Sequence, residues 1–137
     1  MRDLIATFAA ILLLMYYPAQ DTADNINNIR TKMINITVSN AIEVARSDGY
    51  FKPDNIDKMV TKISSALFID KSDILVDVTT TPINRTTVFN SRNSIKYKIS
   101  IPINHVVAMN KFFGISDANN QYYYAIQGES PSELLQK

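Results

Sequence analysis

The chain begins with an apolar block, Leu4–Tyr17, that runs into a long segment with helical periodicity. Between Asp21 and Ser47, apolar residues recur three or four positions apart, which places them on helix faces and predicts a helix with a wide apolar surface. Pro18 is expected to kink or break this helix because it has no amide hydrogen. One apolar line consists of Ile26, Ile29, Met33 and Ile36, and the other of Ile34, Val38, Ala41, Ile42 and Ala45.

A second, shorter helix is predicted over residues 53–68. Pro53 suits a first helical position, and Asp54 and Asp57 lie near the positive end of the helix dipole. Gly49 is the expected end of the first helix, because glycine readily adopts the left-handed conformation found after helix C-termini. The apolar line of the second helix consists of Ile56, Met59, Val60, Ile63 and Leu67.

The remaining residues predict a small antiparallel sheet. Alternation of apolar and polar residues over Ile74–Thr79 and Ile95–Ile101 indicates strands with one buried face. Tyr122–Ile126 is the third expected strand, flanked by Asn119–Asn120 and by Gly128. The polar stretch Thr80–Ser94 is expected to be a connection. His105–Phe113 fits either a short helix or an irregular crossing. The predicted fold class is α+β: a long N-terminal helix plus a short helix packed on a small antiparallel β-sheet.

The chain is long enough for one small domain beyond the apolar helix. We therefore expect an apolar helix for a membrane or a filament core over residues 1–20, and a head domain over residues 21–137. The head domain is expected to comprise a helical stem 21–48, the helix 53–68 and the sheet 73–128.

The apolar block is short for a stable single-pass anchor. Its fourteen residues span about 21 Å as a helix, against about 30 Å of bilayer hydrocarbon. One interpretation is a cleaved secretory signal, with Ala19 or Ala23 near the cleavage point. A second is a plain membrane anchor. A third is a helix held in a membrane before assembly and buried among neighbouring subunits afterwards.

Composition excludes several classes of function. The net charge is +1 with both signs scattered, so there is no footprint for nucleic acid. Cysteine is absent, which excludes a disulfide framework, a thiolate metal site and a cysteine nucleophile. The three glycines form no glycine-rich loop that could hold a phosphate.

The sequence offers no constellation for catalysis. His105 is the only histidine, and it has no partner acid or nucleophile in a recognisable pattern, so no enzyme activity is expected. Five aspartates have a spacing that fits no calcium loop, so no metal or cofactor is expected. They are Asp54, Asp57, Asp70, Asp73 and Asp77.

Tyrosines near the C-terminus and two asparagines are the remaining candidates. In a strand, Tyr122 and Tyr124 share one face and are expected in the core. Tyr123 lies on the other face and is a candidate surface or subunit contact. Asn35 and Asn84 both match the N-glycosylation pattern, and Asn84, in the polar connection, is the better candidate.

The order of these elements resembles type IV pilin-like proteins, which have an apolar N-terminal helix, an amphipathic continuation and a small αβ head. The closer likeness is to TadE-like pilins of tight-adherence systems and to small pilin-like proteins of Gram-positive conjugative elements. The segments that carry the resemblance are the apolar block, Ala41–Gly49, Ile56–Leu67, Ile74–Thr79, Ile95–Ile101 and Tyr122–Ser132.

The N-terminus departs from the type IV pattern. Type IV pilins usually carry a glutamate at the fifth mature position, whereas this chain has Ile5 there and Asp3 as its only early acid. No leader with a basic stretch and a glycine precedes the block. Residue 1 is therefore either a processed N-terminus or the start of a chain that a prepilin peptidase does not process.

The resemblance implies a structural subunit of an extracellular pilus filament. Its partners would be other copies in a helical homopolymer, the membrane before assembly and the pilus assembly machinery. It would be held in the inner or cytoplasmic membrane and then reach the cell surface. The alternative is a non-polymerising, membrane-anchored accessory protein of a secretion or conjugation machine. The expected assembly helix includes Asp3, Leu4, Ala6, Ala9, Ala10, Leu13, Tyr16 and Tyr17.

Specific roles follow for the smallest and the charged residues of that helix. The alanines would let neighbouring helices approach closely. Asp3 is expected to neutralise either Arg2 or the terminal amine of a neighbour, because an unpaired charge in such a bundle is costly.

Overall fold

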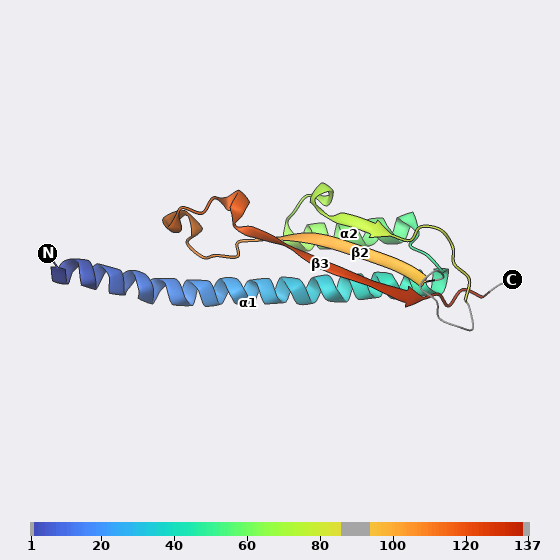
Figure 1. Ribbon diagram of the computed structural model, residues 1–137, viewed down its shortest axis with the longest axis horizontal. Helices are drawn as coiled ribbons and strands as arrows, with labels where there is room; N and C mark the ends of the chain where they lie inside the picture. The colour runs from blue at the N-terminus through green and yellow to red at the C-terminus, as the bar shows by residue number, and fades with distance from the viewer. Residues whose placement is uncertain (1, 86–93, 136–137) are drawn as a thin grey trace. The chain divides into compact units, whose positions relative to one another are not determined.

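The computed structural model describes residues 2–85 and 94–135 and has an α+β fold, as the sequence predicts (Figure 1). Two helices precede a three-stranded antiparallel sheet with the strand order β1-β2-β3. The helices and strands are α1 (Arg2–Asp48), α2 (Pro53–Leu67), β1 (Leu75–Val78), β2 (Ser94–Asn104) and β3 (Gln121–Pro131). Short 3-10 helices are η1 (Lys71–Asp73), η3 (Asn110–Phe113) and η4 (Asp117–Asn119).

The chain forms two compact units. Unit 1 contains Met1–Arg30 and Ile103–Tyr122, and unit 2 contains Thr31–Pro102 and Tyr123–Lys137. The chain passes from one unit to the other within α1, within β2 and within β3. The functional division expected at residue 20 stays a prediction.

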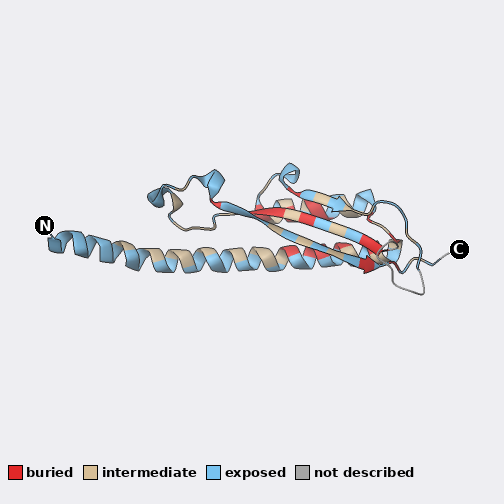
Figure 2. Ribbon diagram, in the orientation of Figure 1, coloured by how far each residue is buried: buried red, intermediate tan, exposed pale blue. Residues whose placement is uncertain are grey.

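Unit 2 holds most of the hydrophobic core. Four of the five residues of the second apolar line of α1 are buried here, and Ile42 is half-buried (Figure 2). Between the helices, the Asn55 side-chain amide of α2 donates a hydrogen bond to the Ala41 carbonyl of α1 at 2.8 Å. Phe51, in the connection between the helices, is fully buried. The buried helical residues are Ile34, Thr37, Val38, Ala41 and Ala45 of α1 and Met59, Val60, Ile63 and Leu67 of α2.

The predicted faces of β1 and β2 are confirmed. β1 pairs with β2 in antiparallel register, with Val78 opposite Tyr97. Lys96 and Lys98 of β2 are exposed, as alternation predicts. The buried face of β2 in unit 2 consists of Ile95, Ile99 and Ile101. The polar connection expected over residues 80–94 lies partly outside the described residues.

Pro18 does not break α1, contrary to one of the two expected outcomes. The helix runs from Arg2 to Asp48 with Pro18 inside it. A proline in a helix interior costs about 3 kcal/mol, because one backbone hydrogen bond is lost and the ring crowds the preceding turn. Helix-forming residues on both sides outweigh this cost. The Pro18 carbonyl also accepts a hydrogen bond from the Thr22 hydroxyl at 2.8 Å.

Gly128 does not flank the last strand as expected but lies inside β3. A Cβ atom at this position would lie 2.5 Å from the Tyr97 hydroxyl and 2.9 Å from the ring carbon that bears it. Glycine is therefore required because the Tyr97 ring covers the strand there. The strand continues to Pro131, five residues beyond the predicted end at Ile126.

Gly49 ends α1 with a φ of 83°, as its position predicts. Its carbonyl accepts a hydrogen bond from the Ile83 amide at 3.0 Å. A Cβ at Gly49 would lie 2.7 Å from the Ile83 carbonyl oxygen and 2.8 Å from a Leu134 methyl group. Both the backbone conformation and the space demand glycine.

We expect Gly49→Ala to destabilise the chain more than Gly114→Ala, which serves as the matched control. Gly114 also has a positive φ of 72°, but nothing lies within 4 Å of its added Cβ. The control should lose about 1–2 kcal/mol from left-handed strain alone. Gly49→Ala should lose about 2–5 kcal/mol, because overpacking adds to that strain. Amide hydrogen exchange measures the opening of each unit, and equal losses would contradict the steric argument.

Candidate functional site

The N-terminal part of α1 presents an apolar surface that nothing in the described chain covers. Among the described residues, α1 is the one helix long and apolar enough to cross a membrane, and the segment that meets this test is 0% buried (Figure 2). A helix in the core of a soluble domain would bury such a segment. The large exposed side chains are Leu4, Ile5, Phe8, Ile11, Leu13, Leu14, Met15 and Tyr17.

The segment between β2 and β3 folds back beside this helix within unit 1 (Figure 1). It forms neither a strand nor an α-helix but contains the short helices η3 and η4. The two alternatives that the sequence left open for His105–Phe113 therefore both apply in part: residues 105–109 cross irregularly and Asn110–Phe113 form a 3-10 helix.

A glutamine of α1 attaches this loop to the helix. The Gln20 side-chain amide donates to the Val106 carbonyl at 3.0 Å, and its oxygen accepts from the Ala108 amide at 2.9 Å. The same oxygen accepts a hydrogen bond from the Tyr16 hydroxyl at 3.3 Å. The Gln20 side chain thus gives the Val106 carbonyl and the Ala108 amide the hydrogen bonds that a neighbouring strand would otherwise supply.

Two asparagines supply most of the remaining pairing. Asn120 is 2% exposed, and its side chain bonds both the amide and the carbonyl of Val107, at 2.7 and 2.9 Å. Its backbone carbonyl accepts from the His105 amide at 2.9 Å. At the other end of the loop, the Asn110 side chain donates to the Ile115 carbonyl at 2.9 Å. The loop conformation therefore depends on side-chain amides.

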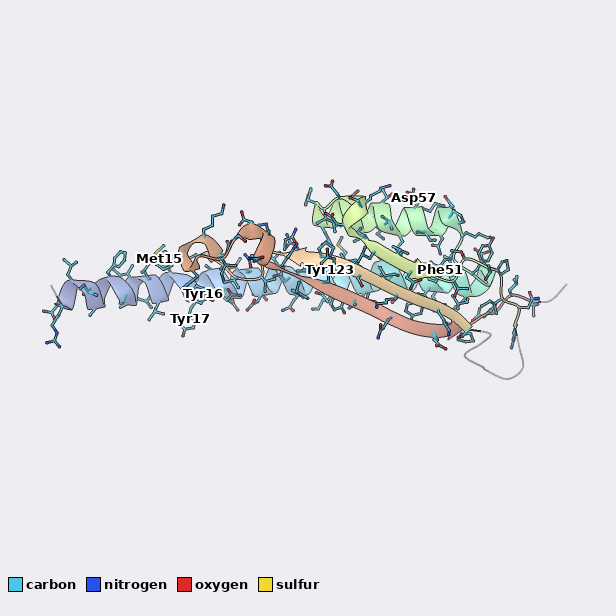
Figure 3. The ribbon with its side chains drawn as sticks, turned by 45° about the horizontal axis from the view of Figure 1, so that its top comes forward. Met15, Tyr16, Tyr17, Phe51, Asp57 and Tyr123 are labelled. Carbon is cyan, nitrogen blue, oxygen red and sulfur yellow. The ribbon has the colours of Figure 1, made fainter. Side chains whose placement is uncertain are left out.

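Between the loop and the helix lies an apolar groove of about 650 Å³. Tyr16 and Phe113 form one wall, with ring centroids 5.2 Å apart in an edge-to-face arrangement. Phe112 packs edge to face against Phe113 at 5.4 Å. Tyr17 projects away from the loop and is exposed (Figure 3). The groove is lined by Ala9, Leu12, Leu13, Tyr16, Val107, Met109, Phe112, Phe113 and Ile115.

Charged groups lie at the edge of this loop. Lys111 and Asp117 form an ion pair at 3.2 Å, and the Asn110 amide also donates to Asp117 at 2.9 Å. These two contacts, the Asn110 hydrogen bond first, hold the pKa of the Asp117 carboxyl below its ordinary value. Asp117 therefore stays ionised at neutral pH and keeps its lysine partner.

The structure brings together three of the residues expected in the assembly helix. Ala9, Leu13 and Tyr16 line the groove. Asp3 is exposed, and its carbonyl accepts from the Thr7 hydroxyl at 2.7 Å. The other members of that set, Leu4, Ala6, Ala10 and Tyr17, are exposed on α1.

The C-terminal tyrosines follow the expectation only in part. Tyr124 is half-buried, and its hydroxyl donates to the Asn35 side chain at 3.1 Å. Tyr122 is exposed, so the expected core position is wrong for this residue. Tyr123 is exposed, as a surface contact requires, and Asn84 is exposed as well.

The candidate polar residues do not gather into a site. His105 is exposed in unit 1. Asp54 pairs with Lys58 at 2.6 Å, and Asp57 pairs with Lys71 at 3.0 Å. Over residues 2–85 and 94–135, no cluster of three or more potential ligands could hold a metal ion.

Sequence reasoning missed the loop wall of the groove and its anchors, Gln20 and Asn120. One signal was present: the adjacent phenylalanines Phe112 and Phe113 precede Gly114 in a stretch without helical or strand periodicity. Such a pair belongs to no core-facing line of a helix or strand. The hydrogen bonds of Gln20 had no local pattern, because they link residues more than eighty positions apart.

Comparisons of the chain with protein-family models, with curated proteins and with solved structures gave no match.

We expect Gln20→Ala to release the loop from α1, because the Val106 carbonyl and the Ala108 amide lose their partner. An unpaired, partly buried polar group costs about 1–3 kcal/mol. Amide hydrogen exchange across residues 106–115 should accelerate, while that of α2 stays unchanged. Asn28→Ala, at an exposed position of the same helix, is the control. Similar exchange of the loop in both variants would show that Gln20 does not hold it.

Proposed function

We propose that the protein is a structural subunit of a pilus-like filament, held in a membrane by the N-terminal part of α1 before assembly. In the filament, the same helix would pack against helices of other copies. The proposal assigns no catalytic role to any residue. Its support comes from the exposed surfaces of α1 and from the contacts of its apolar block.

The apolar block requires a non-aqueous surrounding. Contiguous exposed apolar surface is unfavourable in water and marks membrane or protein contacts. Ala6, Ala9 and Ala10 lie within the block and leave room for a neighbouring helix to approach. This surface supports membrane anchoring and helix bundling equally.

Contacts between the block and the rest of unit 1 argue against a cleaved signal. Tyr16 packs on Phe113, and Gln20 holds two backbone groups of the loop. Cleavage near Ala19 or Ala23 would remove one or both partners and leave loop groups unpaired. The contacts are those of a segment that stays with the mature chain.

The observation that carries the proposal of polymerisation is the first apolar line of α1, which lies beyond the apolar block. Ile26, Ile29 and Ile36 are exposed, whereas the second line is buried in unit 2. A plain anchor needs no apolar residues on its polar stem. A neighbouring subunit displaced along the helix would cover them, and such a heterologous contact repeats into a filament.

Charge at this line should stop polymerisation without affecting the anchor. We expect Ile29→Glu to abolish filaments, because a buried unpaired carboxylate is far costlier than an exposed one. Asn28→Glu, at the adjacent exposed position, should assemble as wild type does. Negative-stain microscopy of the sheared surface fraction measures the filaments, and membrane fractionation measures the anchor.

Filaments of normal abundance in the Ile29→Glu variant would contradict this interface. If the wild-type chain stays in the membrane fraction and forms no filaments, the second candidate, an anchored accessory protein of a secretion or conjugation machine, is favoured instead.

A further test concerns Asp3, the first acidic residue of the chain. If it neutralises a charge on Arg2 or on a neighbour's terminal amine during assembly, Asp3→Ala should slow filament growth and leave membrane insertion intact. Asp3→Glu, which keeps the charge, should restore growth. A time course of filament length by microscopy checks this, and equal growth in all three proteins would make the charge incidental.

A further inference from the structure

We propose that the loop Val106–Ile115 enters the lipid bilayer beside α1, with its phenylalanines among the acyl chains. This inference rests on the membrane-anchoring part of the proposed function. It does not depend on polymerisation. The loop would then be a second membrane-inserted element of unit 1, in addition to the helix.

The position of the loop along α1 determines its depth in the bilayer. The groove is shared by the loop and by residues Ala9 to Tyr16 of α1, so the loop lies at the level of these residues along the helix. At about 1.5 Å per residue, this stretch covers about 10 Å of helix length. A helix whose apolar block lies in the hydrocarbon carries the attached loop to the same depth, in the half of the bilayer nearer to the polar part of α1.

Much of the loop backbone forms hydrogen bonds within the protein. Irregular backbone is excluded from lipid unless its polar groups are satisfied within the protein. Gln20 pairs Val106 and Ala108, and Asn120 pairs Val107. Within η3 and its cap, further bonds run from Phe112 to Met109, from Gly114 to Lys111 and from Ile115 to Asn110. These bonds pair a large part of the loop backbone within the protein, which lowers the cost of placing it in lipid.

The large apolar side chains of the loop are exposed. The loop buries its polar pairing inward and leaves Met109, Phe112 and Phe113 exposed. Large apolar side chains that are exposed side by side mark a membrane or protein contact. The loop places the Phe113 ring against Tyr16, which lies at the end of the apolar block, where tyrosine favours the membrane interface.

Lys111 is compatible with this position. Its ammonium group is exposed and paired with Asp117 at 3.2 Å, so the loop brings no net charge from this pair. Long lysine side chains extend from apolar surroundings to the headgroup region. Lipid is favoured over a second copy as the occupant of the groove, because acyl chains surround an anchored monomer at this depth before any copy binds.

Tryptophan fluorescence tests the depth directly, because the chain contains no tryptophan. Single variants Phe112→Trp and Phe113→Trp each place one fluorophore in the loop. Leu14→Trp, at an exposed position of the apolar block, reports whether the helix is inserted. Phe68→Trp, at a position 92% exposed in unit 2, is the control outside the membrane. The full chain is reconstituted in phosphatidylcholine vesicles with and without bromine on the acyl chains.

We expect bromine to quench the loop tryptophans to an extent similar to Leu14→Trp and to leave Phe68→Trp unquenched. Quenching of Leu14→Trp without quenching of either loop variant would overturn the inference and leave anchoring intact. Loop emission that is blue-shifted, unquenched and dependent on the protein-to-lipid ratio would also overturn it, because a second copy would then cover the groove. An unquenched Leu14→Trp would refute anchoring and this inference together.

Discussion

Helix α1 must bury apolar surface to be stable, and the chain itself covers only part of it. Both compact units include a part of this helix. In unit 2, one of its apolar lines completes the core with α2 and the sheet. In unit 1, the helix contacts the segment from Asn104 to Ile115, and most of its large apolar side chains stay exposed. The proposals above concern what covers the rest, because apolar side chains in this number are not left in water.

Unit 1 is held by polar contacts more than by a core. Among its described residues, Ile103 is the one fully buried apolar side chain, whereas Gln20, Asn120 and Asn110 bond the loop backbone. Arg30 adds a bond to the Asn104 carbonyl at 3.1 Å. Hydrogen bonds gain strength when water is excluded around them.

The sequence predicted those parts of the fold that periodicity determines. Spacings of three and four residues located α1 and α2, and alternation located β1 and β2 with the correct buried face. Gly49 was identified as a helix end because its conformational role is local. Gly128 was misjudged, because only its contact with Tyr97 in the neighbouring strand explains a glycine inside β3. The groove could be predicted on its helical side alone, because the hydrogen bonds that position the loop join distant residues.

The position of Pro18 gives the loop a mechanical role. Because proline has no amide hydrogen, the Leu14 carbonyl lacks its usual helical donor, and α1 bends most easily at this turn. The loop is attached on both sides of Pro18, through the Tyr16 ring before it and the Gln20 amide after it. It therefore bridges the point at which the helix backbone lacks a hydrogen bond. The stiffness of α1 between the apolar block and the polar stem therefore depends on these two contacts with the loop.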